Sequence, residues 1–254
     1  MKASLDDRIA RATELAEIHP AARGLLSFYR ELALFQKPVS EELQLQGGTD
    51  ILALVRHFPA LVDLVRRIGP APLAEFGDRH LQGTAERVQV LLAGWESGPV
   101  DHPGGANECR FYARVLLQPY AEYLASRGDI GTEGAAASCP FCGARPVVAV
   151  LRGEGDGAKR WLLCSLCATE WQYRRVLCPN CGQENKDLLP IYTAVDFEHV
   201  RVEACDNCKT YIKSVDLTRD GHAVPVVDEL ATVALNLWAD EHGYTKFEPN
   251  LLGL

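Results

Sequence analysis

The sequence contains no long apolar run. The longest stretch without Asp, Glu, Lys or Arg extends only from Gly134 to Ala144, which is far shorter than the ~20 residues that span a bilayer. Asp6 and Asp7 lie where a secretory signal would carry positive charge, and no apolar segment follows them. We therefore expect a cytoplasmic protein with no membrane insertion.

Positive charge is also scarce. The 254 residues include 26 Lys and Arg against 34 Asp and Glu, for a formal net charge of −8. A protein that binds nucleic acid without sequence preference needs a basic face. Arg174 and Arg175 are a local exception, but two arginines make only a weak patch. We expect no nucleic-acid partner.

The motifs of common enzyme classes are missing. The sequence has no His-Glu-x-x-His and no Gly-x-Ser-x-Gly element, and the glycine-rich segment 153–157 lacks the Lys-Ser/Thr of a phosphate-binding loop. We interpret this segment as the loop of a hairpin. With no convincing pair of catalytic carboxylates, we predict no catalytic residue, no small-molecule substrate and a protein that is not an enzyme.

Cysteine, by contrast, is abundant. Eight of the nine cysteines form four Cys-x-x-Cys pairs, whereas chance would produce roughly 0.3 such pairs. In a cytoplasmic chain this pattern is more typical of metal binding than of disulfide bonds. The ninth, Cys109, lies on a helical pattern, and we interpret it as a small core residue rather than a reactive thiol.

The cysteine region is an internal duplication. Cys139-Pro-Phe-Cys142-Gly143 returns roughly 40 residues later as Cys178-Pro-Asn-Cys181-Gly182. The pairs Cys164/Cys167 and Cys205/Cys208 recur at nearly the same spacing, and each is followed by a threonine and an aromatic residue. Two copies of one supersecondary unit are therefore predicted, and at about 40 residues each is too small to fold by hydrophobic burial alone.

Each copy can form one closed, tetrahedral four-sulfur site, because two Cys-x-x-Cys turns direct their four thiolates at one point. The alternative joins Cys164 and Cys167 to Cys178 and Cys181, and the duplication makes it less favourable. Zinc and iron suit the spacing equally. A structural role, rubredoxin-like electron transfer and thioredoxin-like redox chemistry stay open, although the last lacks its βαβ context. The expected metal ligands are Cys139, Cys142, Cys164 and Cys167 in one site and Cys178, Cys181, Cys205 and Cys208 in the other.

Hydrophobic periodicity divides the chain. Helical spacing dominates first, alternation of period two follows between the cysteines, and helical spacing returns near the end. We expect Pro38 to end a helix. A single C-terminal helix should bury a face that includes Leu230, Val233, Leu237 and Trp238. The predicted fold is an α+β multidomain protein with an all-helical domain (1–133), two tandem rubredoxin-like or zinc-ribbon units (134–176 and 177–219) and a C-terminal helix and tail (220–254).

Two strings around the cysteines resemble a known family. Arg160 to Trp171 (RWLLCSLCATEW) and Glu203 to Lys213 (EACDNCKTYIK) are similar to signatures of the FdhE family, the formate dehydrogenase accessory proteins, as are the stretches 110–120 and 228–250. The resemblance implies a cytoplasmic maturation factor that binds the molybdenum- or tungsten-containing catalytic subunit of formate dehydrogenase. It also favours iron over zinc for the two metal ions. The alternatives are a rubredoxin-like redox protein that acts on the metal centres of formate dehydrogenase and, disfavoured by the acidity, a zinc-ribbon nucleic-acid-binding protein.

Overall fold

The computed structural model describes residues 3–48, 50–95, 102–128, 136–155 and 157–254. The chain forms two compact units. The first contains residues 1–30, 129–250 and 254, and the second contains residues 31–128 and 251–253. No helix among the described residues is both long enough and apolar enough to cross a membrane.

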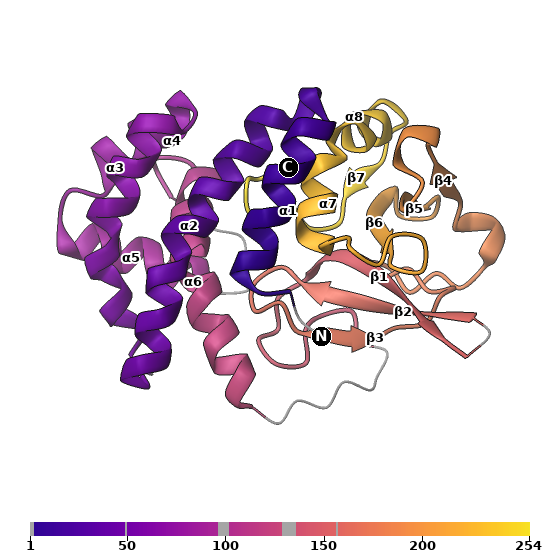
Figure 1. Cartoon of the computed structure of the whole chain (residues 1–254), viewed down its shortest axis with the longest axis horizontal. Coiled ribbons are helices and arrows are strands. Elements are labelled where there is room, and N and C mark those ends of the chain that lie inside the picture. The colour runs from indigo at the N-terminus through magenta and orange to yellow at the C-terminus, as the bar shows by residue number, and fades with distance from the viewer. Residues whose placement is uncertain (1–2, 49, 96–101, 129–135, 156) are drawn as a thin grey trace. The chain divides into compact units, whose positions relative to one another are not determined.

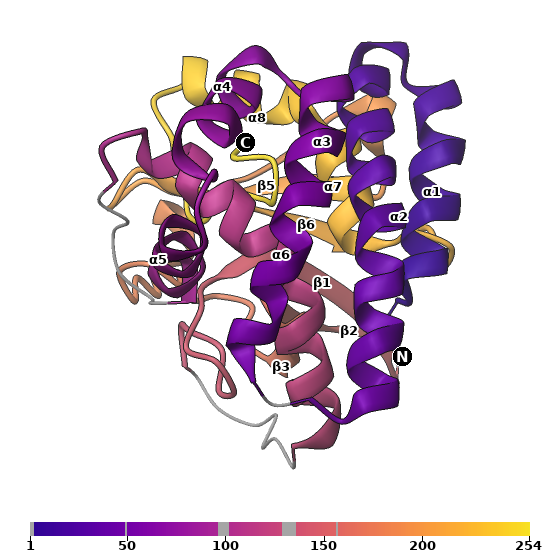
Figure 2. The same cartoon turned by 90° about the vertical axis from the view of Figure 1, so that its left-hand side faces the viewer.

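The second unit is helical, as its periodicity predicts (Figure 2). Asp50 begins a 3₁₀ turn by accepting a hydrogen bond from the Leu52 amide, and Pro59 lies in the first turn of the next helix. A Cβ atom at Gly94 would lie 2.1 Å from the Ala113 side chain, so the two helices that carry these residues approach closely because position 94 has no side chain. The helical elements are α2 (Arg23–Gln46, which contributes to both units), a 3₁₀ segment (Ile51–His57), α3 (Phe58–Ile68), α4 (Ala71–His80), α5 (Thr84–Trp95) and α6 (Ala106–Arg127).

The prediction that Pro38 ends a helix is wrong. Pro38 lies inside α2, which continues to Gln46. Proline removes one backbone hydrogen bond and crowds the preceding turn. Beyond it, Val39 and Leu43 are 2% and 7% exposed, so burial of this apolar face offsets the lost bond and the helix carries on.

The first unit is a sheet with helices (Figure 1). Its helix α1 begins with a capping box in which Ser4 and Asp7 bond to each other's backbone amides. Its elements are α1 (Leu5–Ile18), a 3₁₀ turn (Pro20–Ala22), β1 (Pro146–Glu154), β2 (Gly157–Cys164), β3 (Glu170–Gln172), a 3₁₀ turn (Lys186–Leu188), β4 (Ile191–Thr193), a 3₁₀ turn (Val195–Phe197), β5 (Val200–Cys205), β6 (Thr210–Asp216), α7 (Pro225–Ala231), α8 (Val233–Glu241) and β7 (Thr245–Lys246).

The two cysteine units merge into one sheet. The strand order is β3-β2-β1-β6-β5-β4, so each unit supplies three antiparallel strands in the same order. They join where β1 pairs with β6 in parallel, and β7 adds to β6. Arg160 on β2 also donates to Glu203 on β5 at 2.8 Å. The expected α+β class with a helical N-terminal region and two four-cysteine units is confirmed, and the ribbons are neighbours in one sheet.

One hydrophobic core lies under this joint sheet. Val148 and Val150 of the first ribbon and Val200, Val202 and Val215 of the second are fully buried in the same cluster. Ala223, Leu235, Ala239 and Tyr244 of the C-terminal segment complete it. Although a ribbon of about 40 residues is too small to fold alone, the two ribbons share a core, so metal binding is not their sole source of stability.

The compact units do not follow the four predicted segments one for one. Helix α1 belongs to the unit that contains the sheet. It is held there by Arg11, which donates to Asp228 on α7 at 2.7 and 3.1 Å and to Asp220 at 2.7 Å. Such contacts between residues more than 200 positions apart leave no mark on local periodicity. The predicted boundary at 133/134 lies outside the described residues.

The prediction of a single C-terminal helix is wrong. The helix breaks at Thr232 into α7 and α8, where the Thr232 carbonyl and hydroxyl accept hydrogen bonds from the buried Lys213 ammonium. The break turns a different face of α8 inward. Leu235 and Ala239 are buried, whereas Leu237, expected on the buried face, is 63% exposed.

Candidate metal centres

Each Cys-x-x-Cys pair lies on a tight turn of the same construction. The first pair precedes β1, where the Cys139 amide donates to the Ala144 carbonyl at 2.8 Å and the Gly143 amide donates to the Cys139 carbonyl at 3.0 Å. Cys178 and Gly182 repeat this arrangement in the second ribbon at 2.9 and 3.0 Å. Gly143 and Gly182 have φ of 74° and 72°, a conformation that favours glycine.

The other two pairs connect strands. Cys164 ends β2 and Cys167 follows in the turn before β3, while Cys205 ends β5 and Cys208 follows in the turn before β6. Here the residues after the second cysteine, Ala168 and Lys209, have φ of 51° and 55°. The sequence reasoning missed these two positions because they are not glycines. Their place directly after a Cys-x-x-Cys pair was the available signal.

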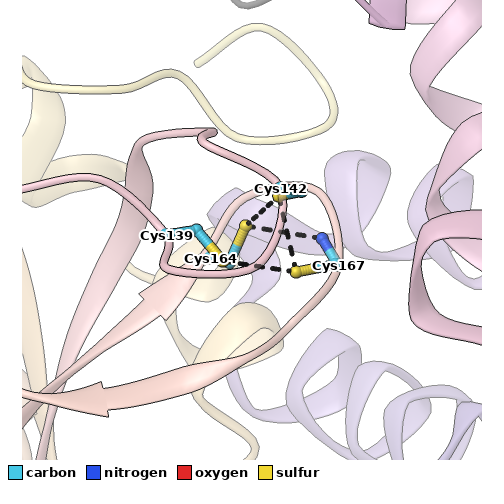
Figure 3. Close-up of side chains that lie close together, drawn as sticks. All are labelled: Cys139, Cys142, Cys164 and Cys167. Atoms are coloured by element: carbon cyan, nitrogen blue, oxygen red, sulfur yellow. Dashed lines mark hydrogen bonds between the residues drawn. The ribbon is translucent and has the colours of Figure 1, made fainter. Parts of the chain in front are cut away.

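The eight sulfurs gather in the two predicted sets. We call Cys139, Cys142, Cys164 and Cys167 cluster 1, and Cys178, Cys181, Cys205 and Cys208 cluster 2. In each cluster the sulfurs all lie within 4.8 Å of one another. The four side chains of cluster 1 point toward one another from two turns (Figure 3), and the alternative pairing of Cys164 and Cys167 with Cys178 and Cys181 is not the one adopted.

The spacing of the sulfurs fits one ion in each cluster. Four sulfurs bound at about 2.3 Å to a tetrahedral ion would lie about 3.8 Å apart. The contacting sulfur pairs lie 3.4–3.5 Å apart in cluster 1 and 3.6–3.7 Å apart in cluster 2. A disulfide bond would instead bring two sulfurs to about 2.05 Å. Two metal ions can therefore be held per chain, and all-sulfur coordination suits zinc and iron alike.

Backbone amides and threonine hydroxyls form hydrogen bonds with sulfurs of the clusters. In cluster 1 the amides of Leu166 and Cys167 donate to Cys164 Sγ at 3.4 and 3.5 Å. The Thr169 hydroxyl lies 3.1 Å from Cys167 Sγ, and Thr210 takes the same place beside Cys208. Burial opposes ionisation of Cys208, yet hydrogen bonds, that of Thr210 first, lower its pKa to about 6.

Cys109 lies apart from both clusters, as predicted for a core residue. It is fully buried on α6, and burial raises the pKa of its thiol to about 11. A thiol that stays protonated at neutral pH is a poor nucleophile and a poor metal ligand.

A third group of potential ligands was missed by the sequence reasoning. His199, Asp220 and Asp228 bring ligand atoms within 4.8 Å of one another, and His199 hydrogen-bonds Asp228 at 2.8 Å. However, the Arg11 guanidinium already donates to both aspartates. A cationic side chain therefore takes the position that a metal ion would need, and we interpret this group as structural.

Two models of one protein family match the chain. Residues 138–175 match the model described as "FdhE, central domain", and residues 176–252 match "FdhE, C-terminal domain". These two segments include all eight clustered cysteines.

Individual proteins of the same family also match the chain. The chain is 32% identical to the "Protein FdhE homolog" of Aquifex aeolicus over 209 residues, covering 80% of this chain and 71% of that protein. It is 37% identical to that of Edwardsiella ictaluri over 275 aligned residues, covering 96% and 86%. The crystal structure of the FdhE protein from Pseudomonas aeruginosa matches with a TM-score of 0.68 at 24% identity, over 99% of this chain and 97% of that one, which shows that the fold is shared.

Proposed function

Because this chain belongs to the FdhE family, we propose that it is an accessory protein needed to form active formate dehydrogenase. It binds the catalytic subunit in the cytoplasm and carries one metal ion in each cysteine cluster, with iron favoured over zinc. The observation that carries the proposal is the family match across both ribbons together with the two four-sulfur clusters. The choice of formate dehydrogenase as the partner, and of iron over zinc as the metal, rests on the family resemblance.

The clusters favour a binding role over catalysis of a substrate reaction. Each one offers four sulfurs, which is the full complement of a tetrahedral ion, so no position is left for a substrate. The eight cysteines would act as ligands, while Thr169, Thr210 and the turn amides would stabilise the sulfur charge. A bound ion would supply rigidity to the turns and, if it is iron, a one-electron couple. We therefore propose a protein that is not an enzyme.

A second candidate is a rubredoxin-like redox protein that acts on the metal centres of formate dehydrogenase. The amide hydrogen bonds to Cys164 Sγ favour it, because hydrogen bonds to sulfur tune the potential of an iron–sulfur site. Protein purified without oxygen should then be coloured and titrate reversibly with one electron per cluster. Colourless protein that contains only zinc would exclude this candidate.

The binding proposal is tested with the full chain as bait in its own cells. We expect the catalytic subunit of formate dehydrogenase to be enriched over an unrelated bait, and formate dehydrogenase activity to be lost when the gene is deleted although the subunit is still made. Absence of enrichment, together with normal activity in the deletion strain, would refute the proposal.

Matched cysteine variants show whether the clusters matter for this role. Cys167→Ala removes one ligand of cluster 1, while Cys109→Ala makes the same chemical change at a buried thiol outside both clusters. The first variant should not restore formate dehydrogenase activity to the deletion strain, and the second should. Full restoration by Cys167→Ala would mean that the maturation role does not need cluster 1.

A further inference from the structure

The two clusters differ in how well their sulfurs are shielded from water. In cluster 1, Cys139, Cys164 and Cys167 are buried and Cys142 is half-buried. In cluster 2, Cys178 and Cys205 are buried, Cys208 is half-buried, and Cys181 is exposed. Two matched pairs of the duplication differ: Cys142 is half-buried where Cys181 is exposed, and Cys167 is buried where Cys208 is half-buried. Cys181 is therefore the most exposed of the eight cysteines.

The turns within the second Cys-x-x-Cys pair of each cluster also differ in exposure, and the turn of cluster 2 is the more exposed. Between Cys164 and Cys167 lie Ser165 and Leu166, which are 6% and 4% exposed. Asp206 and Asn207 occupy the matching places in cluster 2, and Asn207 is exposed. Both turns are anchored by a backbone bond, since the Ser165 amide donates to the Arg145 carbonyl at 3.1 Å and the Asp206 amide donates to the Leu188 carbonyl at 2.9 Å. The difference therefore lies in the exposure of the turns and not in their anchoring.

The hydrogen bonds to the sulfurs show what holds Cys181. Backbone amides donate to a sulfur in both clusters, to Cys164 Sγ in cluster 1 and, from Asn180, to Cys178 Sγ in cluster 2. Cys181 Sγ receives a bond from the Asn207 side chain, whose Nδ2 lies 3.4 Å away on the surface. Water competes for a donor on an exposed side chain, while a buried backbone donor keeps its place. Cys181 is thus the most exposed of the eight cysteines, and its sulfur accepts a bond from a side chain for which water competes.

We propose that cluster 2 is an exchange site, at which Cys181 yields its metal bond to an incoming thiolate, and that cluster 1 is a permanent site. Cys178, Cys181, Cys205 and Cys208 would hold the ion, and an outside thiol would exchange with Cys181 as a ligand. In such an exchange the proton of the incoming thiol would pass to Cys181, so the number of metal–sulfur bonds and the total charge would be unchanged and no electron would move.

The inference goes beyond the proposed maturation role and does not depend on it. It requires that each cluster holds a metal ion and that the two clusters differ in exposure to solvent. It does not require formate dehydrogenase as a partner. The class of acceptor is a soft sulfur donor, since such ligands compete best for an ion bound by four thiolates. That donor is either a small cellular thiol or a Cys-x-x-Cys pair of another protein.

The first experiment maps the exposed ligand directly. The full chain, loaded with two Zn²⁺, is treated with a limiting amount of iodoacetamide, and the modified cysteines are identified by mass spectrometry. We expect Cys181 to be alkylated first, at least tenfold faster than its counterpart Cys142. Equal rates at the two positions, or earlier alkylation in cluster 1, would overturn the proposal.

The second experiment follows release of zinc to the chromophoric chelator 4-(2-pyridylazo)resorcinol. Release should have two phases of equal amplitude. Cys181→Ser should abolish the fast phase and leave about one slowly released Zn²⁺, while the matched variant Cys142→Ser should abolish the slow phase. A single phase for the unaltered chain, or loss of the fast phase in Cys142→Ser, would refute the assignment.

A third variant leaves all eight sulfurs in place. Asn207→Ala removes the side-chain donor to Cys181 Sγ and should speed the fast phase roughly tenfold, as expected for loss of a partner of a metal ligand, without changing the slow phase. An unchanged fast phase would mean that Asn207 does not position Cys181.

The acceptor is identified by replacing the chelator with glutathione or with a Cys-x-x-Cys peptide. Faster transfer from cluster 2 to the peptide than to glutathione supports a protein acceptor, and equal transfer at matched thiol concentration supports a small thiol. Transfer from cluster 1 at the same rate as from cluster 2 would overturn the proposal. None of these readouts involves formate dehydrogenase, so their failure would leave the maturation proposal standing.

Discussion

Glu229 on α7 is the centre of a buried charged network whose removal should destabilise the sheet-containing unit. Its carboxylate is fully buried and lies 2.8 Å from the ammonium of Lys213, which is also fully buried. It further accepts hydrogen bonds from Lys246 at 2.5 Å and from Asn250 at 2.9 Å. One carboxylate therefore compensates two cations that have little access to water.

The proposed change is Glu229→Gln, which keeps the shape of the side chain and removes its charge. Burial by itself would raise the pKa of Glu229, but attraction to Lys213 and Lys246 outweighs it and lowers this pKa from 4.5 to about 2. Burial also lowers the pKa of Lys213 to about 8 despite its attraction to Glu229, so the shift at Glu229 alone does not measure the net contribution of the pair. The expected cost follows instead from breaking a buried ion pair by removing one partner, which is about 3–5 kcal/mol.

The stability of the variant should also respond differently to acid. A carboxylate with a lowered folded-state pKa stabilises the fold above its ordinary pKa and loses this contribution as the pH falls through the folded value. The advantage of the unaltered protein over Glu229→Gln should be constant between about pH 5 and about pH 7, below the lowered pKa of about 8 at Lys213. It should shrink between pH 4.5 and about 2, by at most about 1.4 kcal/mol per pH unit.

The assay is thermal and urea unfolding followed by far-ultraviolet circular dichroism. A loss of about 3–5 kcal/mol should lower the melting temperature by roughly 10 °C. Glu241→Gln, an exposed glutamate at the end of α8, is the matched control and should change stability by less than about 0.5 kcal/mol. A free energy of unfolding for Glu229→Gln within about 1 kcal/mol of that of the unaltered protein, which is about a fivefold change in the equilibrium constant, would contradict this role of Glu229.

Further changes probe other parts of the molecule. Arg11→Ala leaves Asp228, which is 1% exposed, without its bidentate partner and should cost about 3–5 kcal/mol; urea unfolding that matches the unaltered protein would contradict the role given to α1. Cys164→Ser should lower the metal content from about two ions to one by elemental analysis, because a hydroxyl replaces a thiolate poorly. In limited proteolysis, new cuts should stay near the turns of cluster 1 because β1 and β2 keep the shared core; two retained ions would show that Cys164 is not a ligand. Cys109, whose pKa burial raises to about 11, should resist iodoacetamide at pH 8 until urea unfolds the chain, and modification of the native protein would disprove its burial. Gly94→Ala should cost about 1–3 kcal/mol by overpacking against Ala113, which thermal unfolding would detect.

The sequence by itself determined the features that repeat locally. Helical periodicity identified the helices of the second unit, and alternation between Val200 and Ala204 identified β5. The spacing of the cysteines, together with the duplication, predicted both clusters with the correct four members. These predictions succeed because a Cys-x-x-Cys turn is a local structure and each repeat contains all of its own ligands.

Only the tertiary structure decided how these parts combine. The parallel pairing of β1 with β6, the attachment of α1 through Arg11, and the network of Lys213 and Glu229 all join residues that are distant in sequence. Lys213 also donates to the Thr232 carbonyl, at the residue where the C-terminal helix is interrupted, and Leu237 on α8 is exposed. The unequal exposure of Cys142 and Cys181 has the same origin. Two repeats with nearly identical cysteine motifs differ in access to water because their neighbours in space, which no local pattern encodes, are different.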